Sequence, residues 1–388
     1  MEKSNLSISH IKLSKEGCPL PEVSKNFRGW VNYGRNNLFP QEIIGLNSNS
    51  AVNTAILQGK VTFICGKGIY DTAEGVSNYI GQPNRNETWD ELIEKIAVDY
   101  TIFGGFAFQV ILNNDGVTVS LFHQDFSTVR IAAPDKEGNI GSYFIAYDWS
   151  RTTGKDKPIE IDAWHGINDT QAGKAYLFYY ADYQPGLRYY PTPSFYSAIH
   201  YIKADGALGE FYNNSISNGF TPSVVISVPG NPGEEEKAKF QRQVEETFSG
   251  AKNACNILVI WGENDAVKPS VMPFNSSTNA DLYNNIESVV FQKIISAHRL
   301  NSPTLAGVSG SGSLSGNAAE IVSAFILYNY SVIEQLRRKI LDTLNKFTRI
   351  NGLGGLAIEE LEVVTKIRET ENKPEENGNT KSISPKQL

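Results

Sequence analysis

Residues 280–348 constrain the fold most strongly, because two helical patterns there flank a stretch that can bury almost nothing. From 281 to about 298, apolar residues recur at helical spacing. Pro303 ends this pattern, since a proline disfavours helical dihedrals in the residue before it. A second helical pattern, from 318 to about 348, predicts a rod roughly 45 Å long. A helix of that length spans a small domain or joins two.

The segment between these helices is rich in glycine and serine, and Val308 and Leu314 are its only bulky side chains. It lacks the dinucleotide-binding fingerprint, because its glycines have the wrong spacing and follow a helix instead of a strand. We therefore expect a mobile loop without a nucleotide site. The loop consists of Gly307, Val308, Ser309, Gly310, Ser311, Gly312, Ser313, Leu314, Ser315, Gly316 and Asn317.

The composition is that of a folded protein with two or three domains: 388 residues, 40% of them apolar and 11% aromatic. A formal charge of −7 and a sequence pI of about 5.4 argue against a protein that wraps nucleic acid with a basic surface. The three cysteines form no CxxC pair, so we expect neither a disulfide framework nor a zinc site. The sequence predicts no secretory signal and no membrane span, which favours a cytosolic place of synthesis.

Residues 1–190 are expected to form an α+β region, with helices first and a mostly antiparallel sheet after them. The first 50 residues are polar and interrupted by prolines, which favours an irregular arm. Thr88 and Glu91 form a capping box that begins a helix. The expected helices and strands of this region are helices at 50–63 and 88–103 and strands at 105–113, 117–123, 127–133, 142–149, 158–165 and 174–183.

A compact insert is predicted between two helices that span 192–217 and 281–298. The first turn of the helix predicted in the insert carries Glu234, Glu235 and Glu236, where the helix dipole favours negative charge. Outside the insert, the tail from 369 onward is charged and poor in apolar residues, which predicts disorder. The expected elements of the insert are a strand at 223–228, a helix at 234–248 and strands at 256–261 and 267–274.

Residues suited to catalysis are few and scattered. His123 and Asp125 stand two residues apart at a predicted strand end, which places both on one face if the strand extends that far. This pair offers half of a metal or acid–base site, and no third ligand is spaced to complete it. The sequence contains no serine-hydrolase elbow, zinc-protease motif or kinase signature. We expect no catalytic, cofactor or metal site, and an enzyme that uses the face of His123 and Asp125 is an alternative.

Several short motifs follow one another in a fixed order along the second half of the chain. They are YPTPS (190–194), ADG (204–206), FYNN (211–214), NGFTPS (218–223), GAKNA (250–254) and ISAHRLNSPTLAG (295–307). These motifs and the order of the elements resemble the portal proteins of tailed bacteriophages. The likeness is close over 190–348 and rests on element order elsewhere. The chain is short after residue 350 for that family, and a helical crown is not indicated.

The resemblance implies an α+β, portal-like fold with a wing, two stem helices, a small clip, a tunnel loop and a long spine helix. In this interpretation the loop 307–317 lines the DNA channel, and the clip docks partners through Glu234, Glu235, Glu236, Lys237 and Arg242. The implied division is an arm and wing at 1–190, stem helix one at 191–219, the clip at 220–279, stem helix two at 280–300, the tunnel loop at 301–317, the long helix and a short strand at 318–368, and a disordered tail at 369–388.

The resemblance also implies a function. Portals form a ring, usually of twelve copies, at one capsid vertex, and double-stranded DNA enters and leaves through the channel without sequence-specific contact. The implied partners are further copies of the chain, the large terminase subunit, the major capsid and scaffolding proteins and a head-completion adaptor, with no membrane involved. The implied location is the virion, assembled in the host bacterial cytoplasm. A different ring-forming virion or tail-assembly protein is the other alternative.

Overall fold

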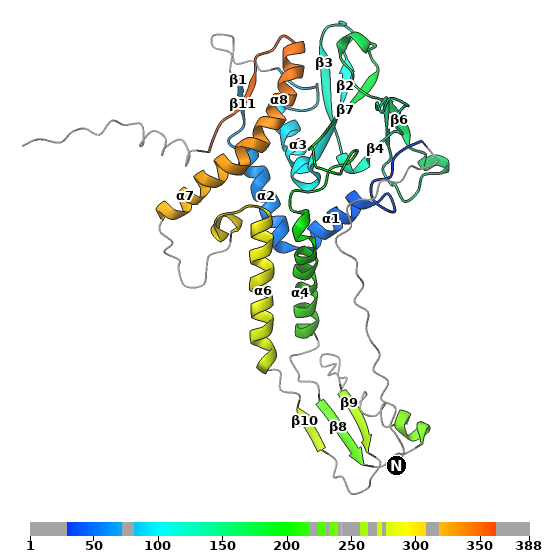
Figure 1. Ribbon diagram of the computed structural model, residues 1–388, viewed down its shortest axis with the longest axis vertical. Coiled ribbons are helices and arrows are strands. Elements are labelled where there is room, and N and C mark those ends of the chain that lie inside the picture. Colours follow the sequence, from blue (N-terminus) through cyan, green and yellow to red (C-terminus); the bar gives the residue numbers. More distant parts are fainter. Residues whose placement is uncertain are drawn as a thin grey trace, which may run out of the picture. The chain divides into compact units, whose positions relative to one another are not determined.

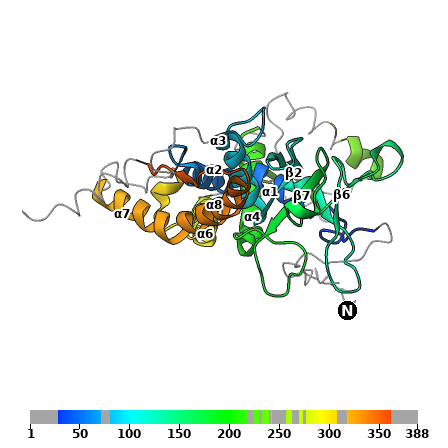
Figure 2. The same ribbon diagram turned by 90° about the horizontal axis from the view of Figure 1, so that it is seen from above.

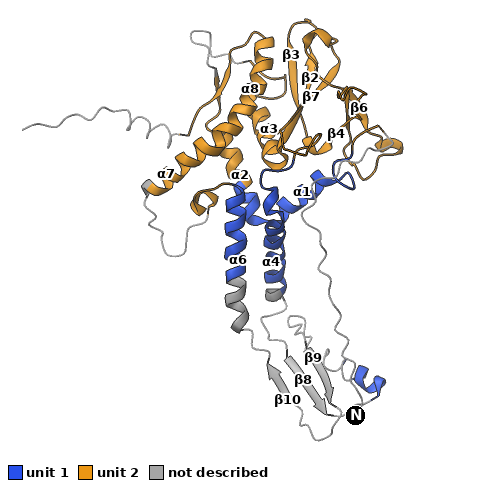
Figure 3. Cartoon of the chain, in the orientation of Figure 1, with its two compact units in different colours: residues 1–24, 32–56, 192–298 blue, residues 25–31, 57–191, 299–388 orange. Residues whose placement is uncertain are grey.

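The computed structural model describes residues 29–71, 81–217, 224–229, 233–239, 242, 257–262, 270–273, 277–307 and 318–361. The chain divides into two compact units, coloured separately in Figure 3. Unit 1 includes Asn32–Ile56 and Thr192–His298, and unit 2 includes Leu57–Pro191 together with the described residues of 29–31 and 299–361. Within these ranges, no helix is both long and apolar enough to cross a membrane.

Unit 1 contains two long helices that pack side by side, α4 (Ile199–Ser217) and α6 (Ser277–Ala297) (Figure 1). These confirm the two helices predicted around the insert. The first of them begins later than predicted, after a short 3-10 turn at Tyr196–Ala198. Pro193 disfavours helical dihedrals at the preceding Thr192, so an α-helix does not begin at residue 192 as predicted.

The structure corrects the prediction that the first 50 residues are irregular, because α1 (Phe39–Asn49) is a helix. Pro40 lies in its first turn, where the missing N–H would be unpaired in any case and the fixed φ suits a helix. The Tyr33 and Phe39 rings stack at the N-terminal end of α1, with centroids 5.1 Å apart. The proline therefore starts a helix here instead of preventing one.

A buried polar junction joins α1, α4 and the first turn of α2 (Ala51–Cys65) within unit 1. Asp205 of α4 accepts hydrogen bonds from Ser50 Oγ at 2.6 Å and from the Val52 backbone N–H at 3.4 Å. Gly206 is required beside it, since a Cβ there would lie 3.0 Å from the Asn49 carbonyl oxygen. The ADG motif of the sequence is thus explained by packing and helix capping.

The predicted insert contains three strands, β8 (Val224–Pro229), β9 (Ile257–Gly262) and β10 (Ser270–Pro273). They form a sheet in the order β10-β8-β9, in which β8 and β9 are parallel and β8 and β10 antiparallel. A helical segment at 234–239 lies between β8 and β9 in the chain, as parallel neighbours need a crossover connection. The strand–helix–strand–strand order agrees with the sequence prediction.

Unit 2 is organised around the central strand β2, which pairs with antiparallel neighbours on both sides. The helix α3 (Trp89–Phe103) packs on this sheet, and its Thr88–Glu91 capping box is confirmed. A second antiparallel sheet has the order β4-β5-β6, and β1 pairs with β11. The strands are β1 (Ile69–Asp71), β2 (Gly105–Leu112), β3 (Val119–Gln124), β4 (Val129–Ile131), β5 (Ser142–Ile145), β6 (Ile159–Asp162), β7 (Ala175–Ala181) and β11 (Leu356–Ile358).

The predicted long helix is present but is not one uninterrupted α-helix. It consists of α7 (Ala318–Tyr328), a π-helical turn (Asn329–Ile333) and α8 (Glu334–Ile350), which follow one another as a single rod in both views (Figures 1 and 2). Phe347 of α8 packs edge-on against Phe108 of β2, with ring centroids 5.1 Å apart. The C-terminal end of the rod therefore packs on the sheet.

Candidate functional site

The two ends of the predicted tunnel loop can be located in unit 2, while residues 308–317 lie outside the described residues. The chain enters the loop from a 3-10 turn at Pro303–Ala306, which Ser302 caps by accepting a hydrogen bond from the Thr304 N–H. Gly307 closes this turn with φ of 79°, a left-handed conformation that glycine adopts without strain. Its N–H is directed at the carbonyl oxygens of Pro303 and Thr304.

The chain leaves the loop into α7, and two side chains tie the two ends together. Asn301 Nδ2 donates to the Ala324 carbonyl oxygen in α7 at 3.0 Å. Arg299 Nη2 donates to the Ser331 carbonyl oxygen in the π-helical turn at 3.2 Å. We call this region, residues 299–307 with the facing side of α7 and the π turn, the loop base. These two hydrogen bonds join the described residues before the loop to those after it.

The loop base packs against the part of α2 that belongs to unit 2. Phe63 meets Phe325 and Tyr328 edge-on, with ring centroids 5.0 and 6.3 Å away. Lys60 is buried one turn earlier, and burial together with the positive charge of Arg299 lowers the pKa of Lys60 to about 7. The loop base therefore contains a buried lysine that loses its proton around neutral pH, far below the ordinary range of an amine.

Sequence reasoning named only the loop and missed its base. Arg299 and Asn301 lie inside the ISAHRLNSPTLAG motif, which was the available signal. Their partners lie 32 and 23 residues further along the chain, on the other side of the loop. Lys60 carried no local signal, because its burial depends on tertiary packing against a distant helix.

The second predicted site, on the insert, is an exposed helix start. The N–H groups of Glu236 and Lys237 each donate to the Gly233 carbonyl oxygen at 3.0 Å, which fixes the first turn. The Glu234 side chain is 92% exposed, and its Oε1 is 3.2 Å from Lys237 Nζ. Glu235, Glu236 and Arg242 are exposed as well. The structure thus places the predicted acidic cluster at the first turn of the helical segment, with its three side chains exposed.

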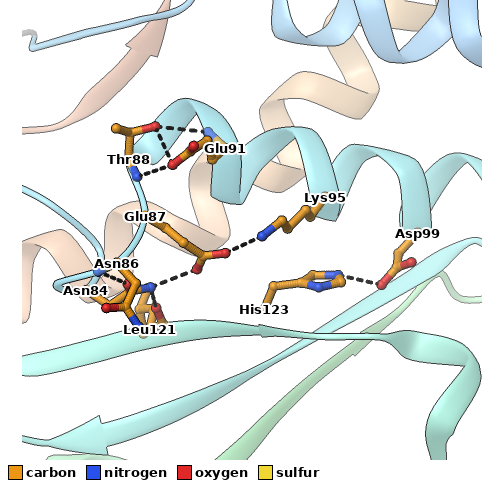
Figure 4. A network of polar contacts seen from close by, with 9 residues as sticks. All are labelled: Asn84, Asn86, Glu87, Thr88, Glu91, Lys95, Asp99, Leu121 and His123. Carbon is orange, nitrogen blue, oxygen red and sulfur yellow. Dashed lines mark hydrogen bonds and ion pairs between the residues drawn. The ribbon is translucent and has the colours of Figure 1, made fainter. Parts of the chain in front are cut away.

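The alternative enzyme site does not form as the sequence suggested, because His123 and Asp125 take different roles. Strand β3 ends at Gln124, and the Asp125 carboxylate caps the following 3-10 turn by accepting from Ser127 N–H at 2.8 Å. His123 Nε2 instead lies 2.9 Å from Asp99 Oδ2 of α3 (Figure 4). The expectation of a shared strand face was wrong, since the chain turns one residue earlier than that face requires.

The surrounding polar side chains tie α3 to β3. Asp99 also accepts from the Phe126 N–H at 3.0 Å, and burial raises its pKa although the His123 hydrogen bond partly offsets this. Glu87 pairs with Lys95, and Asn84 donates to Glu87 and to the Leu121 carbonyl oxygen (Figure 4). Throughout the described ranges, no group of three or more His, Cys, Asp or Glu side chains is placed to hold a metal ion. These contacts join α3 and the residues just before it to β3, and we call this network the α3–β3 tie.

No protein-family model matches the chain, and no curated protein sequence matches it. Solved structures do match its fold. A chain from the virion of the native gene transfer agent (GTA) particle aligns with a TM-score of 0.57 and 15% identity, over 86% of this chain and 88% of that one.

Two chains from the neck of GTA particles match equally well. One, from the neck of the empty particle computed with C6 symmetry, has a TM-score of 0.58 and 15% identity over 86% of this chain and 89% of that one. The other, from the neck of the native particle computed with C12 symmetry, has a TM-score of 0.57 and 16% identity over 85% of this chain and 88% of that one. This protein therefore shares its fold with components of the GTA virion and neck.

Proposed function

We propose that the chain is a portal protein of a tailed phage, a prophage or a phage-like particle. In this role it forms a ring, of twelve copies as in the symmetry of one matching neck, through which double-stranded DNA passes. The observation that carries the proposal is the loop base, where a hydrogen bond from Asn301 to Ala324 joins the residues on either side of a Gly/Ser-rich loop. The chain also shares its fold with virion neck chains over most of its length.

The physical chemistry of the loop suits a conduit. A channel must contact its cargo without binding it tightly, and residues 307–317 carry no formal charge that would pair with phosphates. Glycine and serine let each copy take its own conformation around a DNA duplex whose symmetry differs from that of the ring. Since the ends are tied at the loop base, these conformations need not strain α7 or α2.

The exposed acidic helix start at 234–236 supports a docking role for the insert as the clip. We infer that it meets the large terminase subunit during packaging and the head-completion adaptor afterwards, while the wing meets capsid and scaffolding proteins. The protein needs no active site of its own for this work, because a separate ATPase would supply the energy. Its place would be the capsid vertex, after assembly in the bacterial cytoplasm.

The proposal is tested by shortening the loop and leaving its base intact. Deleting residues 308–316 keeps Gly307 and the Asn301–Ala324 hydrogen bond, so ring assembly should persist at the wild-type level. DNA packaging or retention should fall, because the channel loses its constriction. The matched control, Val308→Ser with Leu314→Ser, keeps the length and removes only the bulky side chains. Loss of rings in the deletion variant would mean that the loop is a structural element, and unchanged packaging would contradict its channel role.

A further inference from the structure

The two halves of the long helix differ in the surface that they leave exposed. In α7 the only charged residue is Glu320, whereas α8 carries charged residues in every turn. Phe325 and Tyr328 cover the side of α7 that packs on Phe63 of α2. A helix that is apolar all round is normally buried on all sides, yet α7 is buried on only one side in a single copy of the chain.

The exposed apolar side chains gather on the outer side of α7 and of the π turn that follows it. Leu327 is 59% and Tyr330 44% exposed, and Val322 and Ile326 are half-buried beside them. We call these four residues the outer α7 face. Beyond the π turn the same side of the rod carries Arg338, Asp342 and Lys346, all exposed. The change from apolar to charged surface therefore falls at the π turn, within one rod.

The ring geometry of the proposed function, on which this inference rests, explains the change. Because α7 begins where the tunnel loop ends, it is the half of the rod nearest to the channel axis. Adjacent copies of a twelvefold ring are separated by about half the radius, so the usual helix packing distance of about 8–10 Å falls at a radius of roughly 15–20 Å. Farther out the copies diverge, and a helix face there meets water.

We propose that the outer α7 face packs against the next copy of this chain in the ring, while the outer side of α8 stays in water. The occupant is a protein surface, because the apolar side chains of Val322, Ile326 and Leu327 are removed from water by packing against other apolar side chains. These side chains form the centre of a larger contact, since a stable interface buries roughly 800 Å² on each partner. Burial of Leu327 at such a centre removes its apolar surface from water and so favours association.

The test compares one substitution on each half of the rod. Leu327→Glu adds one negative charge to the outer α7 face, and Gln335→Glu adds the same charge to exposed α8. Mass photometry at a concentration where wild type is fully assembled should show rings for Gln335→Glu and single subunits for Leu327→Glu. Rings of Leu327→Glu at the wild-type level would overturn the inference. Absence of rings in wild type itself would instead overturn the proposed function.

A milder variant and a direct probe cover the case in which Leu327→Glu does not fold. Leu327→Ala removes apolar area without adding charge and should weaken association at each interface about tenfold to a hundredfold. Hydroxyl-radical footprinting of wild type should show Leu327 protected in rings and reactive in dissociated subunits. A Leu327 that stays reactive in rings, and is protected only when a capsid or adaptor protein is added, would assign the face to that other protein and contradict the inference.

Discussion

Among the groups of buried polar side chains in unit 2, the α3–β3 tie and the loop base differ in how completely the chain itself pairs them. In the α3–β3 tie, Asp99 accepts from both His123 and the Phe126 N–H. At the loop base, the Tyr328 hydroxyl and Asn329 Nδ2 are buried without a hydrogen-bond partner in the described part of the chain. Buried polar groups are paired in most native structures, so the loop base departs from the usual pattern and the α3–β3 tie follows it.

The difference separates a structural role from a functional one. A network that the chain completes alone stabilises unit 2 whether or not other copies are present. The loop base is strained in comparison, because Lys60 is buried beside the positive Arg299, and it adjoins both the tunnel loop and the outer α7 face. We expect the first cluster to govern folding and the second to govern assembly and channel behaviour.

The largest effect on stability should come from breaking the α3–β3 tie. Asp99→Ala leaves His123 and the Phe126 N–H without their acceptor, and we expect it to lower the free energy of unfolding by about 3–5 kcal/mol. Asp99→Asn retains an acceptor oxygen and should cost distinctly less. Chemical denaturation of both variants measures the effect. Equal and small losses would show that the tie contributes little, and the comparison of the two clusters would fail.

Replacing the buried lysine should act in the opposite direction. Lys60→Met removes the cost of holding an amine uncharged beside Arg299, and we expect it to raise the free energy of unfolding by about 2–4 kcal/mol at pH 7. Its effect on ring formation should be smaller than that of Leu327→Glu, because Lys60 lies beneath the surface.

The gain depends on pH in a direction fixed by the lowered pKa. Between about pH 7 and 10.5 the unfolded chain holds a proton on Lys60 that the folded chain has lost, so wild-type stability rises with pH in this window. The advantage of Lys60→Met is therefore largest at and below pH 7 and should shrink by about 2 kcal/mol by pH 9. An advantage that is constant over this range would show that Lys60 titrates normally and that the loop base is not strained.

Loosening the loop base should have a smaller and more local effect. Asn301→Ala removes one hydrogen bond on an exposed side chain and should cost about 1 kcal/mol. Hydrogen exchange should accelerate in residues 303–306 and at the start of α7, while exchange in α3 is unchanged. Faster exchange in both regions would mean that the two clusters are one cooperative element, contrary to the comparison.

The smallest effect on stability is expected on the insert, outside both clusters. Glu234, Glu235 and Glu236 replaced together by Lys should change the free energy of unfolding by about 1 kcal/mol or less, because all three side chains are exposed. Binding to the large terminase subunit should weaken at least tenfold, and the triple Gln variant should lie between. Unaltered terminase binding would count against the docking role.

These features differ in how far the sequence could predict them. The Thr88–Glu91 capping box and the positions of strands β2 to β10 were predictable, since they depend on neighbours within a few residues. The α1 helix was missed because Pro40 was taken to interrupt a helix. A proline favours the first turn of a helix and disrupts its middle. The π turn at 329–333 interrupts a helical pattern that continues on both sides, so periodicity gave no sign of it.

The candidate sites follow the same rule. The glycine and serine content marked the loop, but the hydrogen bond from Asn301 to Ala324 joins residues separated by the whole loop and has no local signal. His123 was misassigned because its partner, Asp99, comes from a preceding helix, which a strand pattern cannot reveal. Short-range chemistry was visible in the sequence, and the contacts that decide function depend on the tertiary fold.

The central claim is that this chain works as a ring around a channel, and electron microscopy of the purified full-length protein tests it most directly. Class averages should show closed rings with an open centre, of twelve copies if the symmetry follows that of the matching neck. Leu327→Glu, imaged under the same conditions, should give no rings. A wild-type protein that stays monomeric at high concentration would contradict the account.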